Sequence, residues 1–182
     1  MCAGGDDCDR DLRGHHLQHL LVLFVERALL ACPATERARD PSANDQRHET
    51  LKTDETFWDW SINVNLRSYF FACQSVIPGM QAAGGGSIIN FSSISFMMAD
   101  TGYAAYITAN AGIVGLTRTL AREFGPDRIR VNAVAPGWVL TERQKEMWVT
   151  PEALANHLAR QCLPDPIQPG DVAGTVLFLA SN

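Results

Sequence analysis

A pair of adjacent serines and a tyrosine at a fixed spacing from them are the groups in this 182-residue chain best suited to catalysis. Ser92 and Ser93 end an apolar run, and Tyr106 follows Ser93 thirteen residues later. Asn110 lies four residues beyond Tyr106, so a helix would place both side chains on one face. A serine and a tyrosine hydroxyl at the edge of a sheet can together hold a carbonyl or alcohol oxygen while a proton is exchanged with it. The spacing therefore predicts a proton-transfer site.

A parallel strand-helix-strand unit is expected to position these groups. Residues 87–91 form a continuous apolar run behind a glycine-rich turn, typical of a parallel strand buried on both faces. Apolar residues then recur at helical spacing over 103–124, and a second apolar run, 129–135, ends at Pro136-Gly137. Ligands of open α/β sheets bind outside the carboxyl ends of the strands, where the serines and Pro136-Gly137 fall. The predicted fold class is α/β with a parallel sheet.

Four motifs together resemble the short-chain dehydrogenase/reductase family. They are Asn63-Val-Asn65-Leu66, Asn90-x-Ser92-Ser93, the spaced Tyr106, and Pro136-Gly137-x-Val139-x-Thr141. The resemblance covers about residues 43 to 181. It implies a doubly wound parallel sheet of Rossmann-like type, incomplete here, because residues 43–182 would be the catalytic half of such a domain.

The resemblance also implies roles for individual residues. Tyr106 would be the general acid/base, Ser93 would hydrogen-bond the substrate oxygen, and Asn65 would belong to a proton relay. The cofactor would be NAD or NADP, and the sequence leaves the choice between them open. The residues implied in cofactor binding are Tyr106, Asn110, Pro136, Gly137, Val139 and Thr141.

Asn110 is the main departure from the family pattern, which has tyrosine followed four residues later by lysine. That lysine hydrogen-bonds the nicotinamide ribose, and its charge also favours ionisation of the tyrosine. Asparagine can hydrogen-bond the ribose but carries no charge. A unit charge ~5 Å away at an effective dielectric near 20 is worth roughly 3 kcal/mol. The sequence therefore predicts a crippled or strongly alkaline-shifted active site.

Within the family, several segments look most like the aldose 1-dehydrogenases, such as xylose dehydrogenase. These segments are Asn44-Asp45-x-Arg47-His48, 58–67, Arg143-Gln144, Trp148-x-Thr150-Pro151-Glu152 and Gln161-Cys162-Leu163. The substrate would be a small molecule, a sugar or another alcohol. The candidate substrate-binding residues are Asn44, Ser93, Trp138, Gln144 and Trp148. The alternative for Trp138, Gln144 and Trp148 is that they pack a lid over the site.

Two long helices are predicted, over 54–80 and 103–124. Thr53 can cap the first, and Pro78-Gly79 is expected to end it. Asn65 lies in its middle, where a short amide needs a hydrogen-bonding partner unless it is exposed. By resemblance, these helices would supply the interfaces of a homodimer or homotetramer.

Composition excludes some classes of function. The net charge of -5, from 15 basic and 20 acidic residues, gives no basic field for nucleic acid. No apolar run approaches the ~18 residues of a membrane span. Five cysteines without paired spacing favour a reducing cytoplasm over a disulfide framework. We expect no metal site, because His15 and His19 lack an intervening carboxylate.

Residues 1–42 do not resemble the family and contain no glycine-rich phosphate-binding turn. Asp6, Asp7, Asp9 and Asp11 precede the apolar stretch, unlike a signal peptide, which begins with basic residues. We predict that this segment is an aberrant leader outside the fold, translated from a shifted frame or a misassigned start. The competing hypothesis for the whole chain is a catalytically inactive, truncated family member or an inert oligomer partner.

Overall fold

A three-stranded parallel sheet forms the centre of the molecule. The computed structural model describes residues 20–22 and 47–181. The sheet has the order β1 (Leu20–Val22), β2 (Gly86–Phe91) and β3 (Ile129–Val134). Ile88 of β2 is in register with Leu21 on one side and Val131 on the other. The two strands predicted to carry the site are thus confirmed as parallel neighbours.

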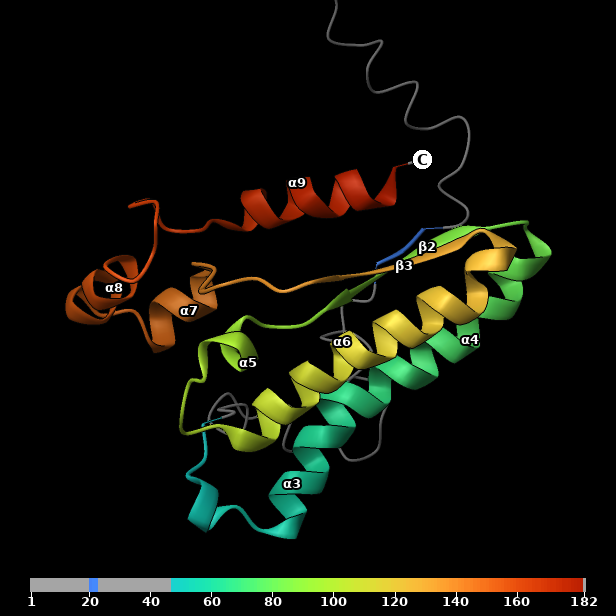
Figure 1. The fold of residues 1–182 in the computed structure, drawn as a ribbon. Coiled ribbons are helices and arrows are strands. Elements are labelled where there is room, and N and C mark those ends of the chain that lie inside the picture. The colour runs from blue at the N-terminus through green and yellow to red at the C-terminus, as the bar shows by residue number, and fades with distance from the viewer. Residues whose placement is uncertain (1–19, 23–46, 182) are drawn as a thin grey trace, which may run out of the picture.

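Helices cover both faces of this sheet (Figure 1). α4 (Ser68–Ala82) and α6 (Ala104–Phe124) lie on one face, and α9 (Pro169–Ala180) lies on the other. Such a two-sided arrangement around a parallel sheet is the doubly wound α/β architecture. The predicted fold class is confirmed.

The first long helix differs in detail from its prediction. It begins as α3 (Glu55–Ile62), passes through a π-helical turn, η6 (Asn63–Arg67), and continues as α4. Its cap is Asp54, whose carboxylate accepts a hydrogen bond from the Phe57 N–H at 2.8 Å, so the prediction of Thr53 was wrong. The Thr53 hydroxyl instead donates to the Glu49 carbonyl at 3.1 Å.

Pro78 does not end this helix, as the sequence predicted, but lies inside α4. A proline in a helix removes one backbone donor and bends the chain, yet neighbouring packing can hold the helix together. Here the buried Ile77 and Met80 on either side anchor α4 to the core. The helix ends only at Ala82, before Gly84 and Gly85 adopt positive φ angles.

The remaining elements are short. A 3-10 turn, η5 (Thr50–Lys52), precedes α3, and η7 (Gly125–Asp127) links α6 to β3. α5 (Ser95–Met98) follows β2, whereas α7 (Glu142–Met147) and α8 (Pro151–Leu158) follow β3. Thr150 caps α8 by accepting from the Ala153 N–H, and Pro151 occupies its first turn, as predicted.

The core lies between the sheet and the α4–α6 pair. Its buried members are apolar and come from both helices and from β2 and β3: Tyr69, Cys73, Ile77, Met80, Ile88, Ile113, Leu120, Ile129 and Val131. Gly112 lets α6 approach η6 closely, because a Cβ there would meet Leu66 Cδ2 at 2.8 Å. Burying each large aliphatic side chain stabilises the fold by roughly 1.5–3 kcal/mol.

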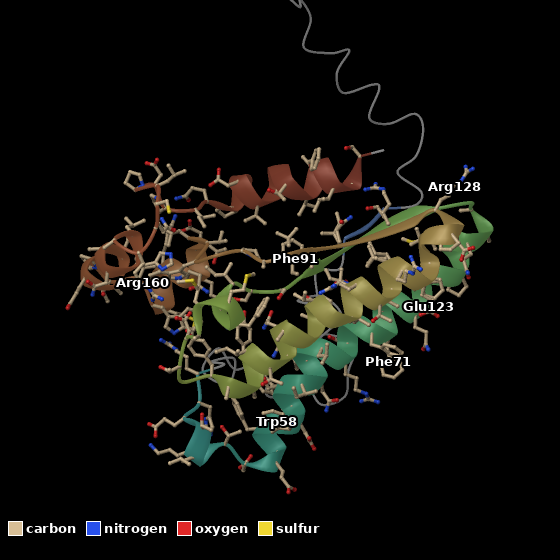
Figure 2. The ribbon with its side chains drawn as sticks, in the orientation of Figure 1. Trp58, Phe71, Phe91, Glu123, Arg128 and Arg160 are labelled. Carbon is tan, nitrogen blue, oxygen red and sulfur yellow. The ribbon has the colours of Figure 1, made fainter. Side chains whose placement is uncertain are left out.

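The parallel strands set a direction that decides where ligands can bind. Figure 2 shows Arg128, which precedes β3, and Phe91, which ends β2, at opposite ends of the strands. The Phe91 end is therefore the carboxyl edge. No helix within the described ranges is long and apolar enough to cross a membrane.

Residues 1–42 contribute one described element, the strand β1, which pairs with β2. The rest of that segment lies outside the described residues, with Cys2, Cys8, Cys32, His15 and His19. The domain boundary near residue 42 stays a prediction.

Candidate active site

The segments that follow β2 and β3 run side by side at the carboxyl edge of the sheet. The Ser92 N–H donates to the Val134 carbonyl at 2.8 Å, and the Ile94 N–H donates to the Pro136 carbonyl at 3.2 Å. These bonds continue the pairing of the two strands beyond their ends. The loop after β2 is thereby fixed against the loop after β3.

The two adjacent serines have different environments. Ser92 is buried, and its hydroxyl donates to the Asn110 carbonyl in α6 at 2.8 Å. Ser93 is half-buried, and its Oγ accepts a hydrogen bond from the Ser95 N–H at 3.2 Å. Ser92 therefore holds the end of β2 against α6, whereas Ser93 is the serine that a ligand can reach.

Tyr106 lies in the first turns of α6, one turn before the residue that Ser92 contacts. Its side chain is half-buried, so neither Tyr106 nor Ser93 is sealed in the interior. The Tyr103 ring lies edge-on to it, with centroids 6.2 Å apart. Ser93 and Tyr106 therefore belong to the same edge of the sheet. That their hydroxyls converge on one substrate oxygen stays a prediction.

Asn110 is buried and turned back onto its own helix. Its side chain is only 4% exposed, and Nδ2 donates to the Tyr106 carbonyl at 2.9 Å. One donor that could serve a cofactor ribose is thus used within α6. The amide supplies no charge to the neighbouring phenol.

Tyr69 is a polar neighbour of the site that the sequence analysis missed. It is buried in α4, where burial raises its pKa far above the usual range and the nearby Tyr106 phenol raises it further. A hydrogen bond with the Phe91 backbone acts in the opposite direction. The only sequence signal was its position four residues after Asn65.

Asn65 lies in the π-helical turn η6, a geometry that recurs at functional sites. It is half-buried, and Nδ2 donates to the Ser61 carbonyl at 2.9 Å. The amide thus has the hydrogen-bonding environment that its mid-helix position required. Its part in a proton relay is not tested by this geometry.

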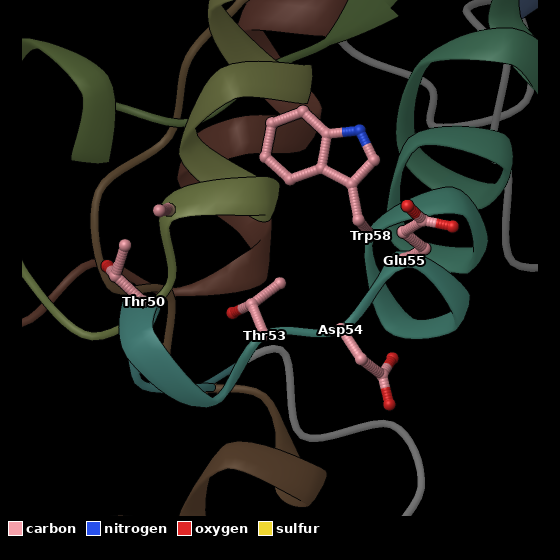
Figure 3. A pocket seen from close by; sticks show the side chains of 6 residues that line it. Thr50, Thr53, Asp54, Glu55 and Trp58 are labelled. Carbon is pink, nitrogen blue, oxygen red and sulfur yellow. The ribbon is translucent and has the colours of Figure 1, made fainter.

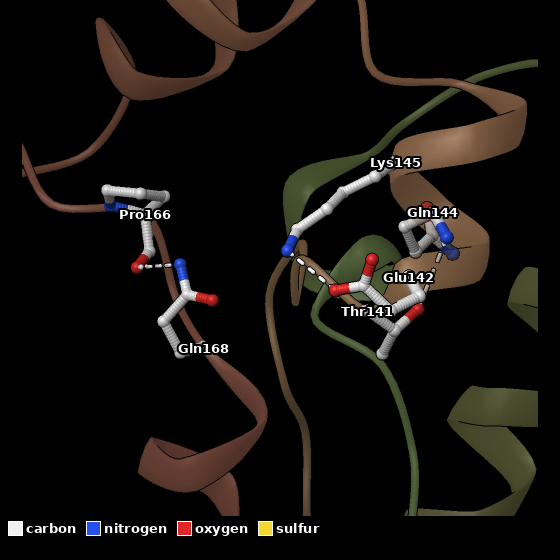
Figure 4. Close-up of polar contacts among 6 residues, drawn as sticks. All are labelled: Thr141, Glu142, Gln144, Lys145, Pro166 and Gln168. Atoms are coloured by element: carbon white, nitrogen blue, oxygen red, sulfur yellow. Dashed lines mark hydrogen bonds and ion pairs between the residues drawn. The ribbon is translucent and has the colours of Figure 1, made fainter.

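The loop after β3 contains the residues predicted to bind the nicotinamide. Gly137 lies tightly between two side chains, because a Cβ there would meet Ile167 Cδ1 at 3.1 Å and Ile94 Cδ1 at 3.4 Å. The Thr141 hydroxyl accepts from the Gln144 N–H at 3.2 Å and so caps α7 (Figure 4). Thr141 has a structural task in addition to any contact with a cofactor.

The side chains of the predicted substrate residues Trp138, Gln144 and Trp148 make different contacts, although the Trp148 N–H donates to the Gln144 carbonyl at 3.0 Å. Trp138 Nε1 donates to Gln144 Oε1 at 2.7 Å, and the Trp138 ring meets the edge of the His157 ring at 5.2 Å between centroids. Trp148 instead lies under the Arg47 guanidinium, 5.0 Å from its centroid. The structure thus brings Trp138 and Gln144 together. Asn44 lies outside the described residues.

Helices α7 and α8 are tied to the body by contacts at the surface. Arg160, just after α8, pairs with Asp100 at 3.4 Å, and Arg47 over Trp148 makes a second link. Exposed pairs of this kind contribute at most about 1 kcal/mol each. These two surface contacts add little, whereas the contacts of Trp138 with Gln144 and His157 join both helices to the loop after β3.

A shallow cavity of about 300 Å³ lies away from these groups, between the starts of α3 and α6 (Figure 3). It is lined by Thr50, Thr53, Asp54, Glu55, Trp58 and Ala104. None of the predicted site residues lines it. Within the described part of the chain, no cluster of three or more His, Cys, Asp or Glu side chains could hold a metal ion.

Comparison with known proteins gives one consistent result. The family model described as enoyl-(acyl carrier protein) reductase matches residues 41–182. A protein of Rhizobium meliloti assigned as the galactose dehydrogenase GalD is 50% identical over 141 residues, which are 78% of this chain and 55% of the relative. The D-xylose 1-dehydrogenase of Caulobacter vibrioides is 52% identical over 141 residues, 78% of this chain and 56% of the relative.

A solved structure agrees with this result. A protein of Beutenbergia cavernae, assigned as an NAD(P)-dependent gluconate 5-dehydrogenase and carrying NADP at low occupancy, superposes with a TM-score of 0.70 at 31% identity. The superposition covers 74% of this chain and 54% of that chain. The chain therefore spans about half the length of the relatives it matches.

Proposed function

Because the chain belongs to the short-chain dehydrogenase/reductase family, we propose that it acts as an NAD(P)-dependent oxidoreductase on a CH–OH group of a sugar. The reaction would be of the aldose 1-dehydrogenase type, with Tyr106 as the general acid/base. The observation that carries this proposal is the common sheet edge of Ser93 and the half-exposed Tyr106. The sugar class is supported by the two relatives at 50% and 52% identity.

The side chains at this edge suit the removal of a proton from an alcohol. Ser93 Oγ would hold the substrate oxygen, and the Tyr106 phenolate would take the proton of the substrate hydroxyl as the carbonyl forms. Asn65 would pass that proton on toward solvent. NAD(P)⁺, when bound, supplies the acceptor for the hydride that leaves the same carbon.

The loop after β3 fits the amide end of the nicotinamide. The Val139 N–H makes no hydrogen bond within the described part of the chain, whereas its carbonyl accepts one from the Thr141 N–H at 2.9 Å. A carboxamide needs donors of this kind. We propose that Pro136, Gly137, Val139 and Thr141 form that pocket, with Asn110 toward the ribose.

The second candidate function is that of an inactive family member. Asn110 favours it, because this buried amide is bonded to the helix backbone and brings no cation to the phenol. Such a chain could act only as an oligomer partner. We also propose a cytoplasmic location, which suits the two free cysteines of the described chain, Cys73 and Cys162.

The test is to titrate the full chain with NADH and NADPH and to assay sugar-dependent reduction of each oxidised cofactor. Tyr106→Phe and Ser93→Ala should each lower the rate by about 10²–10⁴-fold with little change in cofactor binding. Tyr103→Phe is the matched control, because it removes a neighbouring phenol. Cofactor binding without turnover, or no cofactor binding at all, would contradict the dehydrogenase proposal and favour the inactive alternative.

A further inference from the structure

Two buried polar atoms have no hydrogen-bonding partner among the residues that the structure describes. They are Ser95 Oγ and His157 Nε2. A buried polar group without a partner destabilises a fold, so its presence calls for an explanation other than stability. Catalytic and binding sites are where such costs are usually found.

Ser95 is joined directly to the candidate active site. Its side chain is 6% exposed, and its N–H donates to Ser93 Oγ at 3.2 Å. It begins α5 at the carboxyl edge of the sheet, two residues beyond Ser93. The Ser95 backbone therefore contacts the serine proposed to hold the reacting oxygen, while the Ser95 hydroxyl makes no bond within the described part of the chain.

His157 reaches the same region from α8. Its ring packs edge-on against Trp138, 5.2 Å between centroids, while Trp138 Nε1 is already bonded to Gln144 Oε1. The Gln144 oxygen, a predicted substrate group, is thus occupied. His157 Nε2 is the buried polar atom beside Trp138 that still lacks a partner.

The loop after β3 connects the two orphaned groups. Pro136 accepts from the Ile94 N–H at 3.2 Å, next to Ser95, and Trp138 follows two residues later against His157. The ends of α5 and α8 also approach each other, because Asp100 pairs with Arg160 at 3.4 Å. Ser95 and His157 therefore flank one short loop, at the mouth of the site.

We propose that Ser95 and His157 form a substrate subsite that holds two hydroxyl groups of a cyclic sugar, one near each end of the Pro136–Trp138 loop. This inference rests on the proposed function. A serine hydroxyl can donate and accept, and imidazole Nε2 does either according to its tautomer, so both match sugar hydroxyls. The Trp138 ring supplies an apolar wall for the ring carbons. Both atoms are shut off from solvent here, so the α7–α8 segment would have to shift for a sugar to reach them.

The first experiment measures thermal stability of the full chain without ligand. Ser95→Ala and His157→Phe each remove an orphaned atom and keep the local packing, so the melting temperature should be unchanged or raised. Ser92→Ala is the contrast, since it breaks a formed bond to the Asn110 carbonyl and should lower the melting temperature. Destabilisation of Ser95→Ala comparable to that of Ser92→Ala would overturn the proposal, because the hydroxyl would then be structural.

The second experiment measures stabilisation by D-galactose and D-xylose, each titrated with NADPH present. Ser95→Ala and His157→Phe should each need about tenfold more sugar for the same shift, which corresponds to 1.4 kcal/mol. Ser75→Ala, on the exposed face of α4, is the control and should respond like the unmodified chain.

The outcomes separate the inference from the function on which it rests. Equal sugar affinity in the unmodified chain and in both variants would overturn the subsite alone. An unmodified chain that responds to NADPH but to neither sugar would overturn the proposed sugar substrate and the subsite with it. A weakened sugar response in Ser95→Ala and His157→Phe, with an unchanged NADPH response, supports both the proposed function and the subsite.

Discussion

Asn110 lies one helical turn beyond the proposed acid/base, where a charge would matter most. Its amide is 4% exposed and bonded to the Tyr106 carbonyl, so it contributes to the helix and not to the ionisation of the phenol. A cation at this position would favour the phenolate by roughly 3 kcal/mol at ~5 Å and an effective dielectric near 20. The chemistry of the site therefore depends on this one side chain.

Asn110→Lys should raise the rate of sugar oxidation near neutral pH by at least about tenfold and move the pH profile down by about two units. The ammonium group would compensate for the lost bond within α6. The measurement is a pH-rate profile. Asn110→Met has the length of lysine without its charge, and equal profiles for the Lys and Met variants would show that charge is irrelevant here.

Cys73 makes stability depend on alkaline pH. Burial raises the pKa of its thiol from 9.0 to about 11, so the folded chain keeps the proton that the unfolded chain releases. Its stabilising contribution is complete below pH 9 and is lost as the pH rises toward 11. A shift of about two units corresponds to about 3 kcal/mol.

Thermal melts between pH 8 and 11 should therefore fall more steeply for the unmodified chain than for Cys73→Ala. The buried Tyr69 phenol has a pKa raised in the same direction, but it is present in both proteins and cancels in the comparison. Parallel slopes would show that the Cys73 thiol ionises over the same pH range in the folded and unfolded chains, so that burial does not raise its pKa.

At the scale of elements, a buried polar pair joins β2 to α6. Asn90 Nδ2 donates to Thr117 Oγ1 at 2.9 Å, and Cys73 Sγ lies 3.7 Å from Asn90 Oδ1. Asn90 is 0% exposed, so no water can replace a lost partner. This pair positions the strand that leads into Ser92 and Ser93.

Thr117→Val keeps the shape of the side chain but leaves an Asn90 N–H unpaired, which should lower the free energy of unfolding by about 1–3 kcal/mol. Urea denaturation measures it. In the double variant Asn90→Leu/Thr117→Val no amide N–H is left unpaired and only the weak Cys73 S–H donor loses its acceptor, so part of that loss should be recovered. Additive losses in the double variant would argue against a direct pair.

The elements that sequence could predict are those with a strong apolar period. β2, β3, α6 and α8 follow from runs and spacing, and so does the common sheet edge of Ser93 and Tyr106. The sequence could not predict that Asp54 rather than Thr53 caps α3, because both residue types are good helix caps. Only the geometry of the folded chain decides which side chain faces the Phe57 N–H.

The π-helical turn η6 and the unpaired atoms Ser95 Oγ and His157 Nε2 could not be predicted from the sequence for another reason. η6 keeps the apolar period of its neighbours, so the pattern around Asn65 does not reveal it. Ser95 and His157 stand out by lacking partners, which is a property of the folded chain. Tyr69 likewise becomes a neighbour of Tyr106 only when α4 packs against α6.

At the scale of the molecule, the outer face of α4 exposes aromatic side chains. Phe70 is 43% exposed and Phe71 48%, and their rings meet edge-on at 5.3 Å. Phe71 points away from the sheet (Figure 2). Exposed aromatic clusters of this kind are typical of protein interfaces. This face belongs to the first of the two helices, 54–80 and 103–124, that were predicted to join copies of the chain.

Phe71→Glu should convert the predicted oligomer to a smaller species, measured by sedimentation over a range of concentrations. A carboxylate in an apolar interface would lose its hydration, whereas in the monomer it can pair with Arg67, whose guanidinium already lies 5.2 Å from the Phe71 centroid. The fold itself should therefore be kept. Leu177→Glu on α9 is the control, because Leu177 is 68% exposed on the opposite side of the sheet. If Leu177→Glu dissociates the protein and Phe71→Glu does not, α9 forms the interface. An unmodified chain that is monomeric at every concentration contradicts the prediction of an oligomer.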